Sequence, residues 1–236
     1  FVAPILAGRK KEKSMRNCIL LIAVLLFASC GNDDKKNASK SSKTKARPTY
    51  YERSLNSMVR IITYDVYGQK IADGQGVYVG ADIVITSLEW FKGAYTAKIN
   101  TMESKAAHPV YGYVAYDLDN NLVALRIGKR NKEKLMPIDT TKLASTDTIY
   151  TLDCKKKKTL KTSFRYSDGM LSISELKEGA AVIDNKGCLR GLATDGNKIV
   201  SADKLVTLMA KLVETHYNIY ELRLKSNKTY PSYTRI

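Results

Sequence analysis

The sequence has few of the residues that build metal centres and disulfide scaffolds. Among its 236 residues there are two histidines, His108 and His216, and four cysteines. So few cysteines exclude a disulfide-dense scaffold. Two histidines leave little room for a zinc centre or for a histidine general base. We therefore expect neither a metal site nor another cofactor.

Positive charge is abundant, but much of it lies outside the part of the chain that can form a core. The formal net charge is +16, and residues 1–50 alone hold eleven basic against three acidic side chains. The polar, basic stretch at residues 35–50 lacks the aromatic and glycine pattern of a nucleic-acid-binding module. We expect a disordered basic tether over residues 30–54 and no nucleic-acid partner. Contact of this tether with anionic headgroups is the alternative to a fully solvated segment.

The amino-terminal part has the pattern of a secretory signal. Met15 is followed by an uncharged apolar run over residues 18–28. The run is too short for a membrane span, which needs ~20 residues, and is typical of the hydrophobic region of a signal peptide. We expect residues 1–14 to be an upstream extension of the reading frame and residues 15–29 to be the signal peptide.

The end of this signal resembles the lipobox of bacterial lipoproteins. In Phe27-Ala28-Ser29-Cys30, small residues precede a cysteine. The resemblance implies that Cys30 carries diacylglycerol, and acyl chains hold a protein to a membrane without a spanning segment. It therefore implies an exported lipoprotein, anchored at the outer membrane. Asp33 and Asp34 resemble the surface-export signals of Bacteroidetes lipoproteins, while an ordinary signal peptide is the alternative to the lipobox.

Beyond residue 55, short runs of β-branched and aromatic residues alternate with Gly, Asp and Asn. Such spacing favours β-barrels. The first six expected strands are residues 59–65, 77–79, 83–86, 95–99, 110–116 and 122–127. The second six are residues 148–152, 160–166, 170–173, 181–183, 189–193 and 198–200. The pattern predicts an all-β protein with two barrels.

The period changes to that of a helix after Ser201, which is placed as an N-cap. The apolar residues expected on one helical face are Leu205, Leu208, Met209, Leu212 and Val213. Apolar and polar residues alternate again from Ile219 to Leu224. Residues 217–236 are therefore expected to be a tail that adds one edge strand.

Three blocks of the sequence resemble trypsin-like serine proteases of the bacterial HtrA/DegP type. Residues 74–94 are similar to the family's Gly-Ser-Gly-Phe strand and its Val-Thr-Asn-x-His-Val. Residues 119–127 are similar to Asp-Leu-Ala-Leu-Leu-Lys-Val, and residues 177–193 to Asn-Ser-Gly-Gly-Pro and the strands after it. The resemblance implies a trypsin-like double β-barrel, closed by a C-terminal α-helix, at residues 55–216.

All three catalytic positions depart from the family's pattern. By the resemblance, Glu89 stands at the general-base histidine, Asn121 at the aspartate and Glu178 at the nucleophilic serine. A triad needs an attacking hydroxyl, an imidazole that takes its proton and a carboxylate that orients the imidazole. None of the three side chains has the required group. Gly179 marks the turn that shapes the oxyanion hole in the family.

Other serines lie near these blocks, at positions 87, 172 and 174, but none has the glycine-rich setting of the family's nucleophile. We therefore expect a protein that is not an enzyme, a catalytically inactive lipoprotein that binds a peptide, a protein or a glycan at the cell envelope. Two alternatives stay open. One is an enzyme of changed chemistry that uses Glu89 and Glu178 as a carboxylate pair, and the other is a residual serine-protease-like hydrolase. Two carboxylates alone do not complete a metal site.

Two features remain outside this interpretation. The run from Lys155 to Lys158 is expected at an exposed hairpin tip, and contact with a polyanion or lipopolysaccharide is the alternative to a solvated run. Cys154 and Cys188 are the remaining thiols, and the sequence leaves open whether they form a disulfide.

Overall fold

The computed structural model describes residues 50–104, 106–128, 135–167, 170–173, 176–195 and 198–226. The expected signal peptide and the expected lipidation site at Cys30 lie outside these residues. Within the described residues, no helix is long and apolar enough to cross a membrane.

The described chain begins with two short helices, α1 (Tyr50–Ser54) and η1 (Leu55–Ser57). The Ser54 hydroxyl donates to the carbonyl oxygen of Gly187 at 3.2 Å, which attaches α1 to the second half of the fold. The folded part therefore begins before residue 55, and the last residues of the expected tether are helical.

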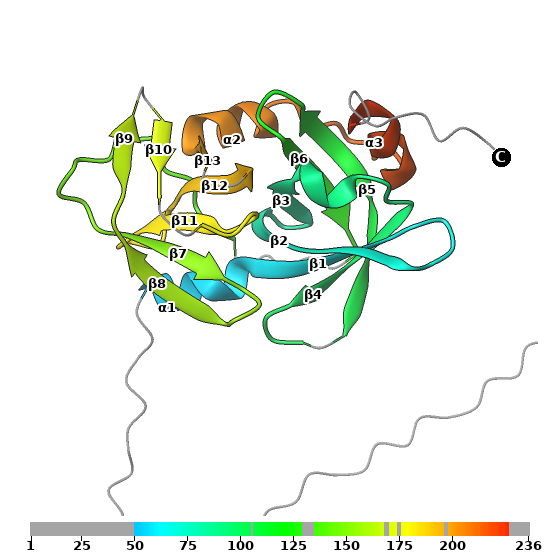
Figure 1. Cartoon of the computed structure of the whole chain (residues 1–236), viewed down its shortest axis with the longest axis horizontal. Coiled ribbons are helices and arrows are strands. Elements are labelled where there is room, and N and C mark those ends of the chain that lie inside the picture. Colours follow the sequence, from blue (N-terminus) through cyan, green and yellow to red (C-terminus); the bar gives the residue numbers. More distant parts are fainter. Residues whose placement is uncertain are drawn as a thin grey trace, which may run out of the picture. The chain divides into compact units, whose positions relative to one another are not determined.

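The first six strands form a closed antiparallel barrel in the order β1-β2-β3-β6-β5-β4 (Figure 1). Their bounds are β1 (Met58–Tyr64), β2 (Lys70–Gly80), β3 (Ile83–Ser87), β4 (Thr96–Thr101), β5 (Ala107–Asp117) and β6 (Leu122–Ile127). Each of the six runs expected from the sequence falls on one of these strands. The first barrel is thereby confirmed.

Strand β3 is buried on both faces, which places its end deep inside the molecule. Val84 points into the core of the first barrel, whereas Ile83 and Ile85 belong to the cluster between the two halves. Successive side chains of a strand face opposite sides. A strand that is apolar on both sides therefore lies between two cores, and Ser87 at its end is fully buried.

The second half is a sheet of seven strands in the order β8-β7-β11-β12-β13-β10-β9. Their bounds are β7 (Ile149–Asp153), β8 (Lys158–Thr162), β9 (Arg165–Ser167), β10 (Met170–Ser172), β11 (Ala181–Asp184), β12 (Leu189–Asp195) and β13 (Lys198–Ser201). The single strand expected at residues 160–166 is split, because the chain bends at residues 163 and 164.

This bend decides how the second half closes. Its two pieces, β8 and β9, form the two edges of the sheet and are consecutive in the chain. The sheet must curl until these edges meet at the bend. In the described residues, the two edges of the sheet are therefore joined by the covalent connection between β8 and β9 and not by hydrogen bonds between these two strands. A second barrel of the predicted kind would instead be closed by hydrogen bonds between its edge strands. Phe164, at the bend, packs against the core inside this sheet.

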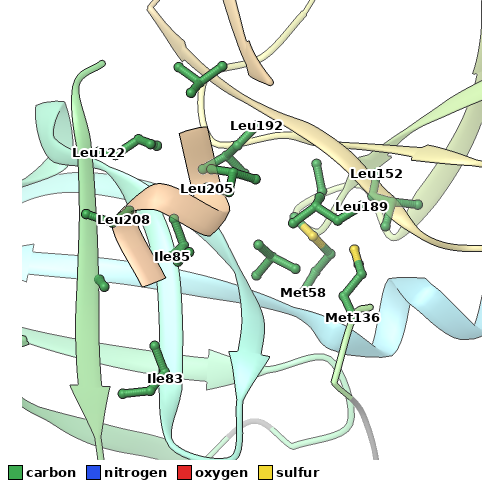
Figure 2. Packing of buried hydrophobic residues seen from close by; sticks show 14 of the residues in the cluster. Met58, Ile83, Ile85, Leu122, Met136, Leu152, Leu189, Leu192, Leu205 and Leu208 are labelled. Atoms are coloured by element: carbon green, nitrogen blue, oxygen red, sulfur yellow. The ribbon is translucent and has the colours of Figure 1, made fainter. Parts of the chain in front are cut away.

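Helix α2 (Ala202–Met209) packs over the core between the two halves (Figure 2). Leu205 and Leu208 are fully buried there. The helix ends earlier than the apolar spacing predicts, since the N–H of Val213 donates to the carbonyl oxygen of Val114 at 3.2 Å and the chain runs along β5. Ser201 holds the N-cap position with an extended backbone, but its side chain makes no capping hydrogen bond.

The edge strand expected after residue 217 is wrong, because residues Ile219–Ser226 form helix α3. Ile219 and Leu222 are buried in the cluster of the first barrel. Residues three apart share a helical face, whereas in a strand they point to opposite sides. The core contact of both residues therefore favours the helix over the strand, and the folded domain extends beyond residue 216.

Candidate functional site

The candidate site lies where the first barrel meets the second half. Ser87 is the last residue of β3 and pairs with Leu122 of β6, so that Asn121, just before β6, lies beside it. Glu178 lies in the turn before β11 and reaches Ser87 from the second half. The structure thus brings together two of the three predicted triad positions, Asn121 and Glu178, through a serine that the sequence analysis gave no catalytic role.

The Ser87 hydroxyl is the centre of the hydrogen-bond network at this site. It donates to the Glu178 carboxylate oxygen Oε1 at 2.6 Å, and it also lies 3.0 Å from the carbonyl oxygen of Thr194. It accepts from the Asn121 amide Nδ2 and from the N–H of Glu89, both at 3.2 Å. A hydroxyl has one hydrogen and two lone pairs. The two donors occupy the lone pairs, so the short contact to Glu178 takes the hydrogen and Glu178 acts as the acceptor.

The turn that carries Glu178 requires a glycine next to it. The N–H of Ala180 donates to the carbonyl oxygen of Lys177 at 2.9 Å, and Gly179 has a φ of 74°. A Cβ at Gly179 would lie 2.4 Å from the carbonyl oxygen of Gln75. Gly179 is therefore needed for the left-handed backbone and for the close approach of the two halves. Its N–H donates to the carbonyl oxygen of Ala193 at 2.7 Å, so this N–H is used within the fold.

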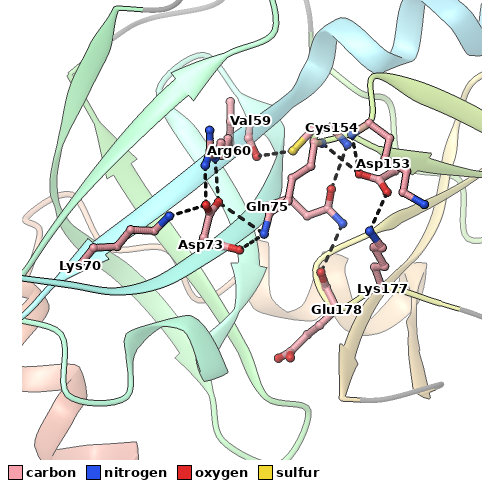
Figure 3. Close-up of polar contacts among 11 residues, drawn as sticks. Val59, Arg60, Lys70, Asp73, Gln75, Asp153, Cys154, Lys177 and Glu178 are labelled. Atoms are coloured by element: carbon pink, nitrogen blue, oxygen red, sulfur yellow. Dashed lines mark hydrogen bonds and ion pairs between the residues drawn. The ribbon is translucent and has the colours of Figure 1, made fainter.

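Gln75 connects this turn to the first barrel and to the β7–β8 hairpin (Figure 3). Its side chain is buried, donates to the carbonyl oxygen of Glu178 at 3.3 Å and accepts from the N–H of Cys154 at 3.0 Å. The sequence analysis did not find this residue. Its signal is a polar residue between two glycines, Gly74 and Gly76, in the stretch of β2 that is buried.

The third predicted triad position, Glu89, is engaged differently. Its carboxylate forms an ion pair with Lys92, and its side chain is 38% exposed. The two glutamates thus have different charged or polar neighbours, Lys92 for Glu89 and Ser87 for Glu178. In the described parts of the chain, no group of three or more His, Cys, Asp or Glu side chains is placed to hold a metal ion.

The two thiols of the folded part are free. Cys154 is buried and Cys188 is partly exposed, and neither forms a disulfide. Burial raises the pKa of the Cys154 thiol to about 12. A thiol with so high a pKa is a poor nucleophile at neutral pH.

An ionic cluster around Asp73 holds β1, β2 and the β7–β8 hairpin together (Figure 3). Arg60 binds the Asp73 carboxylate with two nitrogens, at 2.7 and 2.5 Å, Lys70 binds it at 2.6 Å, and Lys155 lies at 3.4 Å. The Arg60 hydrogen bond holds the pKa of Asp73 well below its usual range. Because the folded-state pKa is depressed, this stabilisation is present above pH ~4 and is lost as pH falls further.

A cavity of about 950 Å³ borders the site on the side of Asn121 and Thr194. Asn121 also donates to the carbonyl oxygen of Thr194 at 2.6 Å. The cavity is further lined by Asp139, Lys142, Leu143, Arg190, Lys198, Ile199, Val200 and residues 201–204 at the start of α2. The Arg190 guanidinium is buried and ion-paired with Asp139 at 2.8 Å. Apart from this ion pair, the charged groups that line the cavity are mainly lysine ammonium groups and aspartate carboxylates near the surface.

Comparison with known proteins identifies the fold. Neither a family model nor a curated protein matches the sequence. The Rv3671c protease of M. tuberculosis in its active form matches with a TM-score of 0.59 at 13% identity, over 72% of this chain and 87% of that one. This chain has the trypsin-like fold. The serine endoprotease of Yersinia pestis matches its trypsin-like fold with a TM-score of 0.58 at 14% identity, over 70% of this chain and 66% of that one.

These matches confirm the all-β trypsin-like fold and correct one expectation. The prediction that the chain is not an enzyme is contradicted, because the matched structures are serine proteases and one was solved in its active form. The error has a clear origin. The prediction set Ser87 aside because it lacks the glycine-rich setting of the family's nucleophile, whereas the fold places its hydroxyl against the Glu178 carboxylate.

Ser87 and Glu178 should be energetically coupled. Ser87→Ala should lower the free energy of unfolding by about 1–3 kcal/mol, because the half-buried Glu178 carboxylate loses its short hydrogen bond. Glu178→Gln should cost less, because the amide oxygen still accepts from Ser87. Urea unfolding of both single variants and the double variant measures the coupling, with Ser145→Ala at an exposed position as control. Additive effects of the two changes would contradict the network.

Proposed function

We propose that the protein is an envelope lipoprotein that binds polypeptide segments in the cavity beside Asn121 and Thr194. The observation that carries this proposal is the position of the cavity, which is lined by Asn121 and Thr194, two residues that contact the Ser87 hydroxyl. Its volume of about 950 Å³ is in the range of ligand-binding cavities. The matched structures are named as proteases, which act on polypeptides, and this supports a polypeptide as the ligand.

The lining of the cavity suggests which segments bind. Leu143, Ile199 and Val200 contribute apolar wall, while Lys142 and Lys198 contribute positive charge at exposed positions. Apolar side chains drive binding by leaving water, and charges at the rim select among ligands. Because Asp119 and Asp203 also line the cavity, we expect a segment with apolar side chains flanked by charged ones of both signs.

A second candidate function is hydrolysis of the bound polypeptide by changed chemistry. It is favoured by the 2.6 Å hydrogen bond from the Ser87 hydroxyl to the Glu178 carboxylate, which is the arrangement of a nucleophile and a general base. Ser87 is fully buried. A substrate would therefore reach it only when the turn of Glu178 moves outward, so this chemistry requires an opening step.

Binding should depend on the cavity. Thr140 lines the cavity at an exposed position, and Thr140→Trp should fill part of it and weaken binding of fluorescently labelled, unfolded casein about ten-fold or more. Thr96→Trp, at an exposed position of β4 outside the cavity, is the matched control. Fluorescence polarisation measures both. Equal affinities of the two variants would assign casein binding to another surface.

Cleavage of the bound casein tests the second candidate separately. If Ser87 is the nucleophile, Ser87→Ala should remove all cleavage, and Glu178→Gln should reduce kcat by about 10²–10⁴-fold because the general base is lost. Mass spectrometry of the casein fragments measures this in the binding samples. Fragments formed at an unchanged rate by Ser87→Ala would refute the second candidate and leave the binding proposal standing.

The lipid anchor is a separate part of the proposal and rests on the sequence. Radiolabelled palmitate should enter the protein in cells, and Cys30→Ala should abolish the label, because the thioether at Cys30 is required for acylation. Cys18→Ala changes the other cysteine of the amino-terminal segment and should retain the label. Label that persists in Cys30→Ala would contradict the lipobox.

A further inference from the structure

The β7–β8 hairpin has a tip of defined backbone shape. Its turn covers residues 154–157, and the Asp153 carboxylate accepts from the N–H groups of Lys155 and Lys156 at 3.0 and 3.1 Å. Lys157 adopts a left-handed backbone with a φ of 51°, where glycine would be less strained. The tip therefore presents lysine side chains from a turn of defined shape, and one of them, Lys157, stands where glycine would fit the backbone better.

Three of these lysines carry uncompensated charge. Lys156, Lys157 and Lys158 are exposed, and among the described residues no carboxylate lies within ion-pair distance of them. The neighbouring cations differ, because Lys155 pairs with Asp73 and Lys177 pairs with Asp153. The acidic groups nearest the hairpin are thus already occupied, and three adjacent ammonium groups face solvent.

The hairpin lies at the side where the chain enters the folded domain. The Sγ of Cys154, at the base of the tip, is 3.6 Å from the carbonyl oxygen of Val59, just after α1 and η1. In Figure 1, α1 and β8 both lie toward the lower edge of the domain, whereas α2 lies along the upper edge. Cys30 precedes Tyr50 by 20 residues, which span at most ~70 Å when extended.

We propose that the tip of the β7–β8 hairpin contacts the phosphate-bearing headgroups of an anionic membrane. The proposal rests on the lipid anchor of the proposed function, which brings the hairpin near such a surface. Each lysine close to an anionic membrane strengthens the contact about five-fold. The start of α2, at the upper edge of the domain in Figure 1, lies in the wall of the cavity, so this part of the wall is then on the side away from the membrane.

Lysine acetylation of the membrane-anchored protein tests this contact. The acylated full chain is placed in phosphatidylcholine vesicles with or without phosphatidylglycerol, treated with an amine-reactive acetylating reagent and read by mass spectrometry. With phosphatidylglycerol, labelling of Lys156, Lys157 and Lys158 should fall about five-fold or more. Exposed lysines near the upper edge, Lys204 and Lys211 of the α2 region, should label equally in both membranes. Equal labelling of the hairpin in both membranes would overturn the proposal.

Two further arms separate headgroup contact from nucleic-acid binding and from the effect of the anchor itself. A DNA oligonucleotide added to phosphatidylcholine vesicles should leave hairpin labelling unchanged, and protection equal to that by phosphatidylglycerol would assign the surface to nucleic acid instead. Cys30→Ala removes the anchor, so its hairpin should be protected only by phosphatidylglycerol vesicles added at high concentration. If the wild-type protein carries no acyl chains, the anchor is refuted. The headgroup contact is then judged alone, by whether added phosphatidylglycerol vesicles protect the hairpin lysines from acetylation.

Discussion

The close approach of Gly179 to the Gln75 carbonyl fixes the geometry of the whole site. At this point, the two halves touch backbone to backbone, with no room for a Cβ. The Gln75 side chain then binds the carbonyl oxygen of Glu178, so the same residue limits the approach and orients the turn. Because Ser87 and Asn121 belong to the first barrel, this one contact determines whether Glu178 reaches them. The site is therefore a property of the interface between the halves.

Electrostatics explain why the replacements at the aligned positions fit together. A carboxylate that enters a buried site needs donors, and the Ser87 hydroxyl supplies one at 2.6 Å. An aspartate at position 121 would bring a second negative charge to the same hydroxyl, whereas Asn121 brings N–H groups. Like charges at one buried site disfavour each other's ionised forms. The amide at 121 and the carboxylate at 178 are thus compatible in a way that two carboxylates would not be.

Local patterns in the sequence predicted the first barrel well because each strand alternates or is apolar on both faces. They failed where tertiary contacts decide the outcome. The bend at Phe164 splits one expected strand into two sheet edges, and α3 forms because Ile219 and Leu222 both reach the first core. The resemblance singled out Asn121 and Glu178, which both contact Ser87 in the structure, but it gave no role to Ser87 or Gln75. Their roles arise from partners 91 and 103 residues away, respectively, in the chain.

Near the β7–β8 hairpin, the ion pairs of two carboxylates, Asp73 and Asp153, determine which lysines have an acidic partner. Asp73 receives Arg60, Lys70 and Lys155, and Asp153 receives Lys177 and two backbone N–H groups. Asp73 joins β2 to the hairpin through Lys155, and Asp153 fixes the turn and binds Lys177, whereas neither carboxylate forms an ion pair with Lys156, Lys157 or Lys158. Among the residues that the structure describes, the pairing that holds the hairpin against the first barrel thus leaves Lys156–Lys158 without an acidic partner. A surface charge that follows from such pairing persists as long as the fold does, and no carboxylate of the described residues neutralises it.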